Sequence, residues 1–487
     1  MDPVRRHTVD VRAAASGRRA MSGHIAIVGG GVAGLAAACA LAQDGYAVEL
    51  IERRPYVGGR ASSYFHPGAG EVIDNCQHIV LGCCTNILDM LRRANAEDAM
   101  LWSSGITFLE PGGRRSELKP APLPAPLHSL PSFLRAKALN LGDKIAIAHG
   151  IRSFLKGSRA EDDRKSFADW LKSTRQTARA IEHFWKPVLF SALNEDPDRI
   201  SVRYAAKVFR EAFLFSPEAG RMGVPRLPLS EMYGRVATAI ERAGGRVRLR
   251  TSVDGLCRDA ASGQWRIRIG EQSESFDAVV LALSFEGLHK LLPALPDEAP
   301  RARLEGLLAG FSHSPLTGIH LWFDREITQL EHAVLLDTTV QWLYNTSRIQ
   351  PERQSEREGY LIELVVSASK SLVPMERQAI IDLAMRELAL FFPAMQQAKL
   401  LKAAVVKEVR ATYSIVPGLD ALRPGPESGW PGLVLAGDWT ATGWPSTMEG
   451  AARSGYIAAE AVTRVFGDRR KYLVPDLPRR GLMRVLP

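Results

Sequence analysis

Three glycines with the spacing Gly29-x-Gly31-x-x-Gly34 are the first residues whose types and spacing could support chemistry. Glycines in this pattern permit a tight turn and a close approach of the backbone to a pyrophosphate, and a helix that follows offers free N–H groups. Glu52 lies eighteen residues beyond Gly34, where a carboxylate can accept hydrogen bonds from ribose hydroxyls. The pattern predicts a bound dinucleotide, held by Gly29, Gly31, Val32, Ala33, Gly34 and Glu52.

A second pair of residues, Asp74 and His78, lies in the segment 71–82. Carboxyl and imidazole groups can give or take a proton when they are positioned beside a reacting group, so we predict both as catalytic residues. Each also has a structural interpretation. Asp74 can act as a carboxylate that holds a turn, and His78 as a hydrogen-bonded histidine of the core.

The sequence Gly58-Gly59-Arg60 follows soon after Glu52 and resembles a loop of the flavin-containing amine oxidase and carotenoid desaturase superfamily. In that superfamily the loop lies along FAD, and its arginine helps to hold the cofactor. A predicted strand that ends in Gly437-Asp438 resembles the strand whose aspartate lies against the ribityl chain of the flavin. The resemblance implies FAD as the cofactor, with further contacts from Arg53, Gly59, Arg60, Val253, Gly437, Asp438, Thr447 and Met448.

A helix is predicted to begin near Thr447, directly after the second of these motifs. Ser446 and Glu449 have the spacing of a capping box at its start, with direct catalysis by Glu449 as the alternative. A helix that begins there would point its positive end at the flavin ring and favour the anionic reduced form. Val253 is expected to contact adenine through its backbone, and a plain strand position is the alternative.

The segment from Asp74 to His78, Asp-Asn-Cys-Gln-His, resembles the Asp-Asn-Gly-Gln-His segment of hydroxysqualene dehydroxylases, FAD-dependent desaturase-like proteins of bacterial hopanoid synthesis. Residues 442–451 also resemble that family, and the likeness covers about 24–465. Cys76 stands where the family has glycine, and Cys84 stands where an aromatic residue is usual. A Cβ would cost about 1 kcal/mol at position 76 if the backbone there required a positive φ.

The resemblance implies the reduction of hydroxysqualene, a triterpenoid, to squalene. An allylic hydroxyl leaves as water while reduced flavin delivers a hydride to the carbon. Because hydroxide leaves poorly, an acid must protonate it, and Asp74 and His78 are the predicted candidates. Aromatic side chains of the inserted domain either line a water-poor pocket, where their faces stabilise positive charge, or belong to the core. These are Phe184, Trp185, Trp342 and Tyr344.

The elements that must position these residues begin with a β-α-β unit. Residues 25–28 and 47–51 indicate buried strands on either side of a helix at 35–43, and buried strands at 278–282 and 433–436 return to the same sheet. We predict an α/β fold: a Rossmann-like FAD-binding domain, which is a doubly wound parallel sheet with an antiparallel β-meander, plus an inserted mixed α+β substrate domain.

The domain boundaries follow from the three separated blocks of nucleotide-binding elements. We assign 24–115, 225–285 and 401–465 to a discontinuous FAD-binding domain, and 116–224 and 286–400 to the substrate-binding domain. Within them, 132–220 is mostly helical in pattern. Val247–Leu249 and Trp265–Ile269 alternate like half-solvated antiparallel strands. Residues 1–23 and 466–487 are predicted to be basic, solvated tails.

The charge distribution limits the partners. Of the net charge of +9, residues 1–23 carry +3 and residues 463–487 carry +5, so a broad nucleic-acid face is not expected. Residues 119–156 carry a local +5 beside several leucines, which favours peripheral contact with an anionic membrane over a plain proline-rich loop at the pocket mouth. Five scattered cysteines indicate no metal site and suit a cytoplasmic protein, and no stretch is long enough to cross a bilayer.

Two other functions fit the same residues. One is an oxidative enzyme, either a carotenoid desaturase with a similar apolar tunnel or an amine oxidase with an aromatic cage for the amine. The other is a non-catalytic protein of the flavin fold that binds a lipid. The sequence indicates neither the oligomeric state nor the source of reducing equivalents, since no second dinucleotide motif is present.

Overall fold

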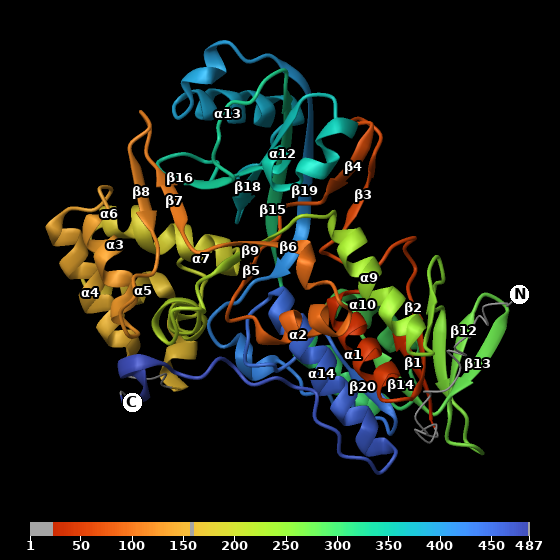
Figure 1. Cartoon of the computed structure of the whole chain (residues 1–487). Coiled ribbons are helices and arrows are strands. Elements are labelled where there is room, and N and C mark those ends of the chain that lie inside the picture. The colour runs from red at the N-terminus through yellow and green to blue at the C-terminus, as the bar shows by residue number, and fades with distance from the viewer. Residues whose placement is uncertain (1–22, 156–159, 486–487) are drawn as a thin grey trace, which may run out of the picture.

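The computed structural model describes residues 23–155 and 160–485, so the predicted N-terminal tail and Lys156 lie outside the described residues. A parallel sheet with its helices forms one part of the molecule, and a larger sheet with a group of helices beside it forms the other (Figure 1). The chain passes between these two parts several times, as the separated blocks in the sequence require.

The parallel sheet confirms the predicted nucleotide-binding core. Its strand order is β10-β2-β1-β14-β20, and every neighbouring pair is parallel. The strands are β10 (Arg246–Arg248), β2 (Ala47–Ile51), β1 (His24–Val28), β14 (Ala278–Leu281) and β20 (Leu433–Leu435). Ile25 and Ile27 pack into a core with the helices on one face, whereas Ala26 and Val28 pack into a second core on the other. Such strands are buried on both faces, which explains their continuous apolar sequences.

Helices cover one face of this sheet and a β-meander covers the other. The helices are α1 (Val32–Gln43), α9 (Leu229–Arg242) and α14 (Met448–Val465). The meander consists of β11 (Gly255–Arg258), β12 (Trp265–Ile269) and β13 (Gln272–Phe276). The assignment of Val247–Leu249 to an antiparallel strand was wrong, because Val247 pairs in parallel with Leu50 at the edge of the main sheet. A three-residue strand is too short for its alternation to identify its partner.

The second part is built on a seven-stranded sheet in the order β19-β15-β18-β17-β16-β7-β8. Its strands are β19 (Leu400–Tyr413), β15 (His313–Phe323), β18 (Tyr360–Ser367), β17 (Trp342–Asn345), β16 (His332–Leu335), β7 (Ile106–Leu109) and β8 (Arg115–Leu118). Helix α13 (Arg377–Ala389) packs on one face. The sheet therefore includes 106–115 and 401–413, which the predicted boundaries placed in the FAD-binding domain. Pairing between distant strands decides this, and the local sequence does not reveal it.

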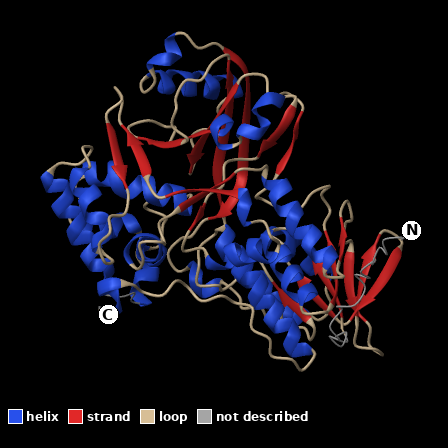
Figure 2. Cartoon of the chain, viewed as in Figure 1, coloured by secondary structure: helices blue, strands red, loops and turns tan. Residues whose placement is uncertain are grey.

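A group of helices lies beside the β8 edge of the large sheet, as Figure 2 shows, and the first of them, α3 (Leu130–Arg135), contacts β8. The longer helices are α3, α4 (Leu141–Leu155), α5 (Phe167–Ser173), α7 (Lys186–Leu193) and α8 (Val202–Phe209). They confirm the mostly helical pattern predicted for 132–220. Trp170, Trp185 and Phe209 pack ring against ring at their centre. No helix among the described residues is long and apolar enough to span a membrane.

The C-terminal strap, residues 468–485, is largely exposed but anchored to the rest of the protein at several points, so the prediction of a free tail was wrong for the anchoring residues. The N–H of Tyr472 donates to Glu460 at 2.8 Å, and the N–H of Leu482 donates to the carbonyl of Ala125 at 2.8 Å. Met483 is fully buried. The strap runs from the end of α14 to the group of helices (Figure 1). Its apolar anchors are irregularly spaced, so no periodic pattern marked it in the sequence.

Candidate active site

The glycine turn between β1 and α1 leaves the space that a dinucleotide needs. Gly29 has φ +110°, and a Cβ there would lie 2.4 Å from the carbonyl oxygen of Ala282. A Cβ on Gly34 would lie 1.9 Å from the carbonyl oxygen of Gly29, so both positions exclude a side chain. Helix α1 begins at Val32, and its first N–H groups, including that of Ala33, have no partner inside the helix. They are suited to hold a pyrophosphate, as predicted.

Glu52 lies at the end of β2, against this turn. Its Oε2 accepts the N–H of Gly30 at 2.7 Å, and its Oε1 accepts the N–H of Arg54 at 2.8 Å. The Glu52 carbonyl accepts the N–H of Thr251 at 2.9 Å, which brings the segment of Val253 to the same end of the sheet. This placement agrees with an adenosine site between them, whereas the Arg53 side chain is exposed to solvent.

The Gly-Gly-Arg loop packs directly on the glycine turn. The N–H of Gly58 donates to the carbonyl of Gly30 at 2.8 Å, and a Cβ on Gly59 would come within 3.0 Å of the Cα of Gly31. Two glycines that face each other leave a cradle that a Cβ would fill. This cradle, together with the free N–H groups of α1, fits the pyrophosphate of FAD.

Arg60 and Asp438 form an ion pair that joins distant parts of the chain. Burial alone would lower the pKa of Arg60, but the Asp438 carboxylate raises it above its usual range. Ser446 donates its hydroxyl to the other oxygen of Asp438 at 2.5 Å. Arg60 also donates to the carbonyl of Ala411 on β19 at 3.3 Å, so it joins the two parts of the molecule, and its side chain remains 35% exposed. Residues 58–60, 437–438 and 446–448 therefore meet, as the family resemblance implied.

The predicted capping box was wrong by one residue. Thr447, rather than Ser446, caps α14 by accepting the N–H of Gly450 at 3.0 Å. Glu449 does not reach back to its own helix but caps α2 (Thr85–Arg93), where it accepts the N–H groups of Asn86 and Ile87, each at 3.0 Å. The hydroxyl of Ser446 is hydrogen-bonded to Asp438, which explains why Thr447, the next residue, caps the helix instead. The N-terminus of α14 still presents Thr447 and Met448 at this point.

Asp74 is hydrogen-bonded in a way that matches its structural interpretation. Its Oδ1 accepts the hydroxyl of Ser63 and, at 3.1 Å, the N–H of Leu229 at the start of α9. Burial raises the pKa of Asp74 to about 6. The carboxyl group joins the segment 74–78 to α9, which favours a positioning role over proton transfer to substrate.

The contacts of the His78 ring determine which of its nitrogens carries the proton. Its Nδ1 lies 2.8 Å from the carbonyl oxygen of Cys76, and because a carbonyl can only accept, Nδ1 carries the proton. Burial lowers the pKa of His78, and the nearby Arg60 lowers it further. The ring is therefore neutral near pH 7, and Nε2 is an acceptor. His78 alone does not supply the acid that the predicted reaction needs.

The cysteine at position 76 is accommodated without backbone strain. Cys76 does not belong to the residues with positive φ. Opposite it on β15 stands Gly318, where a Cβ would lie 3.4 Å from the Cβ of Cys76 and 3.0 Å from the carbonyl oxygen of Asn75. The absence of a side chain at Gly318 therefore leaves room for the segment, and the expected penalty at position 76 does not arise.

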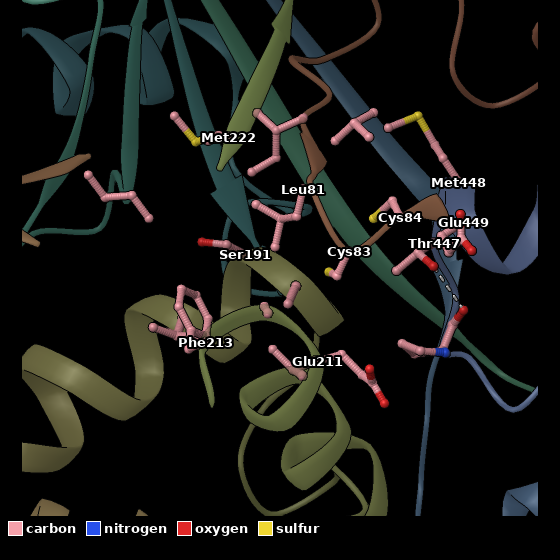
Figure 3. A pocket seen from close by; sticks show the side chains of 18 of the residues that line it. Leu81, Cys83, Cys84, Ser191, Glu211, Phe213, Met222, Thr447, Met448 and Glu449 are labelled. Carbon is pink, nitrogen blue, oxygen red and sulfur yellow. Dashed lines mark hydrogen bonds between the residues drawn. The ribbon is translucent and has the colours of Figure 1, made fainter. Parts of the chain in front are cut away.

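An apolar pocket adjoins these residues, and Figure 3 shows the side chains around it. Thr447 and Met448 border it on the side of α14, and Ile79, next to His78, borders it as well. The space inside is about 150 Å³, less than the 300–1,000 Å³ of typical ligand pockets, so it fits one segment of a long chain. Other lining residues come from the large sheet and the helices: Phe108, Val188, Phe213, Val334 and Trp342.

Of the four aromatic residues predicted to belong either to the pocket or to the core, two lie at the pocket and two lie in the core. Trp342 lines the pocket, and Tyr344 stacks on it with ring centroids 5.5 Å apart. Trp185 is fully buried in the helical core, and Phe184 packs against it. The alternative interpretation as core residues is correct for these two.

Sequence reasoning did not find Glu363, a buried acid on β18. The N–H of Gln77 donates to its carboxylate, while its Oε1 has no hydrogen-bond partner within the described residues. Burial, and then the nearby Asp74, raise the pKa of Glu363 well above its usual range. The signal was available in the sequence, since Glu363 is the only charged residue in the strand Tyr-Leu-Ile-Glu-Leu-Val-Val-Ser. Charged residues are rarely fully buried without a function or a partner.

The fold and the site together define a flavin-dependent oxidoreductase. The family model "Flavin containing amine oxidoreductase" matches residues 32–463, and the chain belongs to that family. FAD is its cofactor.

Individual relatives are more distant. The chain is 27% identical to a zeta-carotene desaturase of Zea mays, over 93% of this chain and 86% of that protein. It is also 27% identical to a 15-cis-phytoene desaturase of Synechococcus elongatus, over 90% of this chain and 95% of that protein. Among solved structures, putrescine oxidase matches with a TM-score of 0.69 at 17% identity, covering 91% of this chain and 99% of that one. An oxidoreductase of Methanosarcina mazei matches with a TM-score of 0.67 at 17% identity, covering 89% of this chain and 98% of that one.

Proposed function

We propose that the protein reduces hydroxysqualene to squalene, with an apolar pocket that holds the allylic alcohol beside the flavin. The observation that carries this proposal is that Thr447 and Met448, the expected flavin contacts, and Ile79, next to His78, line the same pocket. The likeness of 74–78 and 442–451 to hydroxysqualene dehydroxylases supports this substrate.

The residues of the chain have distinct parts in this reaction. Reduced FAD, when bound, supplies the hydride. The glycine turn, Glu52 and the Arg60–Asp438 pair would hold the cofactor. The apolar lining excludes water, and the ring of Trp342 offers a face that stabilises positive charge developing on the allylic carbon. Nε2 of the neutral His78 can accept a hydrogen bond from the substrate hydroxyl and so orient it.

Carotenoid desaturation is the second candidate, and the curated relatives favour it. Those relatives are desaturases of long apolar polyenes, and the same pocket would suit such a chain. An amine oxidase is supported less, because an aromatic cage needs faces on opposite sides of the amine. Trp342 and Tyr344 instead stack nearly parallel, 9° apart, on one strand.

An anaerobic assay separates these functions. The enzyme is supplied with chemically reduced FAD and hydroxysqualene, and squalene is measured by gas chromatography. Squalene formation supports the first proposal. Absence of squalene, together with reduction of bound FAD by phytoene, would support the desaturase instead. A purified protein that is colourless and takes up no added FAD would favour a non-catalytic lipid-binding protein.

We also propose that the enzyme contacts an anionic membrane surface through residues 123–145. The exposed apolar side chains in this range are Leu123, Leu127, Leu130, Leu134, Leu141 and Ile145. Arg135 and Lys137 are exposed among them, whereas the one acidic residue, Asp143, is buried against Thr177. Exposed leucines with basic neighbours suit the interface of an anionic bilayer, where a triterpenoid substrate would be dissolved.

Sedimentation with vesicles that contain phosphatidylglycerol tests this contact. We expect binding at low salt that weakens at high salt, because screening reduces the attraction of the basic side chains. Leu141→Glu should weaken binding at least about fivefold, since Leu141 is 72% exposed. The control Leu390→Glu alters an exposed leucine beyond α13 and should leave binding unchanged. Equal binding by both variants, or none by the unaltered protein at low salt, would refute the contact.

A further inference from the structure

We infer that Glu363 is the acid that protonates the departing oxygen, an inference that rests on the proposed reduction of hydroxysqualene. The residue lies in the middle of β18 and is 2% exposed, and its Oε1 has no hydrogen-bond partner in the described part of the chain. Ile362 and Leu364, its neighbours, pack into the core with α13. Because side chains alternate along a strand, Glu363 lies on the opposite face of the sheet, which is the face that borders the pocket.

The register of the sheet places this carboxyl group one step beyond the pocket wall. Val365 lies directly opposite Trp342, which lines the pocket, and Glu363 lies opposite Tyr344. Two residues along a strand correspond to about 7 Å. Tyr344 stacks on Trp342, so it connects the wall to the position of Glu363.

The segment 74–79 approaches Glu363 from the other side. The N–H of Gln77 donates to the Glu363 carboxyl group, and the chain then continues through His78 to Ile79, which lines the pocket. Glu363 is thus in contact with the segment that carries the predicted catalytic histidine. The sheet and the segment together place the acid beside Tyr344, directly behind the pocket wall that Trp342 and Ile79 form.

The groups around Glu363 favour its protonated form. Asp74 and Cys76 face it from the segment 74–79, His320 lies directly across on β15, and Tyr344 lies across on β17. Burial lowers the pKa of His320 to about 3, so this ring is neutral at physiological pH.

Arg357, the cation that attracts Glu363, is also paired with a second carboxylate. Arg357 is attracted to Glu363, but it also lies 3.3 Å from the carboxylate of Glu71. Burial and the proximity of Asp74 outweigh this attraction and raise the pKa of Glu363 well above its usual range. The protonated form of Glu363 is therefore favoured, whereas the proton of His78 is committed to the Cys76 carbonyl.

The proposed step balances in atoms and electrons. Glu363 gives its proton to the allylic hydroxyl, the C–O bond breaks and water leaves. The carbon is reduced by the hydride that reduced FAD supplies, so the flavin loses two electrons as the new C–H bond forms. Glu363 remains as a carboxylate and regains a proton from solvent before the next turnover.

Glu363→Gln tests this assignment, because glutamine keeps the size and the acceptor for Gln77 but cannot donate the proton. We expect squalene formation to fall by about 100-fold or more, which is the contribution typical of general acid catalysis. Glu363→Asp keeps an acid and should recover part of the rate. The matched control is Glu358→Gln, an exposed glutamate on the approach to the same strand, which should retain the full rate.

Infrared spectroscopy of the FAD-loaded protein at pH 7 gives a readout that does not depend on turnover. We expect a C=O band of a protonated carboxylic acid that is lost in Glu363→Gln and kept in Glu358→Gln. If the unaltered enzyme forms squalene but Glu363→Gln stays within about threefold of it, the acid is another group. A spectrum without the band would also overturn the inference, whereas no squalene from the unaltered enzyme would refute the proposed function itself.

Discussion

The contacts of Glu449 make the sharpest prediction about how the site is held together. Its Oε2 accepts the N–H groups of Asn86 and Ile87, each at 3.0 Å, and its Oε1 accepts the side-chain amide of Asn86 at 2.8 Å. Arg453 lies 3.5 Å away and keeps a second partner in Asp476. The Glu449 side chain is fully buried, so these bonds are made away from bulk solvent.

The magnitude follows from the groups left without a partner. A hydrogen bond to a charged group contributes about 1.5–3 kcal/mol, and loss of a helix cap costs about 1 kcal/mol. Because contributions within one network do not add, we expect Glu449→Ala to lower the free energy of unfolding by about 4 kcal/mol. Glu449→Gln keeps one acceptor oxygen but turns an NH₂ group toward the other donors. We therefore expect this variant to lower the free energy of unfolding by about 2 kcal/mol.

The assay must distinguish a cap from a catalytic group. Urea unfolding of the FAD-loaded protein gives stability, FAD fluorescence gives cofactor release, and turnover is measured with saturating FAD. A capping role predicts that Glu449→Gln loses stability and releases FAD more readily while keeping most of its turnover. Glu298→Gln, an exposed glutamate in the first turn of α11 (Glu298–Leu308), is the control and should change neither property. Unchanged stability with a large loss of turnover would refute the capping role and favour direct catalysis.

Two further predictions concern a buried acid and the C-terminal strap. The pKa of Asp74 is raised to about 6, so the folded state binds more protons than the unfolded state, and stability is lost as pH rises through about 6. Urea unfolding between pH 4 and pH 7 should show that the unaltered protein loses up to about 3 kcal/mol of its free energy of unfolding relative to Asp74→Asn. A difference in stability between the two proteins that stays constant over this range would contradict the raised pKa of Asp74. In the strap, Met483→Ser should lower the free energy of unfolding by about 2–4 kcal/mol because Met483 is fully buried. Val485→Ser, at a site 83% exposed, should have no measurable effect, and equal losses in the two variants would mean that the strap does not anchor through Met483.

The parts of the fold that were predictable depend on neighbours in the sequence. The β-α-β unit around Gly29 and Glu52 could be predicted because buried strands, a glycine turn and an acidic strand end occur within a few tens of residues. The start of α14 was predicted to within one residue. Ser446 is held by Asp438, a residue on another element, and so Thr447 became the cap.

The parts that were not predictable depend on pairing between distant segments. Strand β19 joins the large sheet because it pairs with β15, and nothing local to Leu400–Tyr413 assigns it to one domain rather than the other. Glu363 lies on the same face of the sheet as Trp342, opposite Tyr344, because of the register between β17 and β18, which a single sequence does not determine. The strap is fixed by separate anchors such as Tyr472 and Met483, with no periodicity between them.

The hydrogen bonds at the start of α14 link cofactor binding to the shape of the pocket. Ser446 holds Asp438, which holds Arg60, while Glu449 on the first turn holds α2. Thr447, between them, lines the pocket. A substitution at any of these positions should therefore weaken FAD retention, and it should lower turnover mainly where FAD is not saturating. Substitution of Glu363, which lies in the large sheet behind the pocket wall, should change turnover alone. The two measurements therefore separate the residues that hold the flavin from the residue proposed to supply the proton.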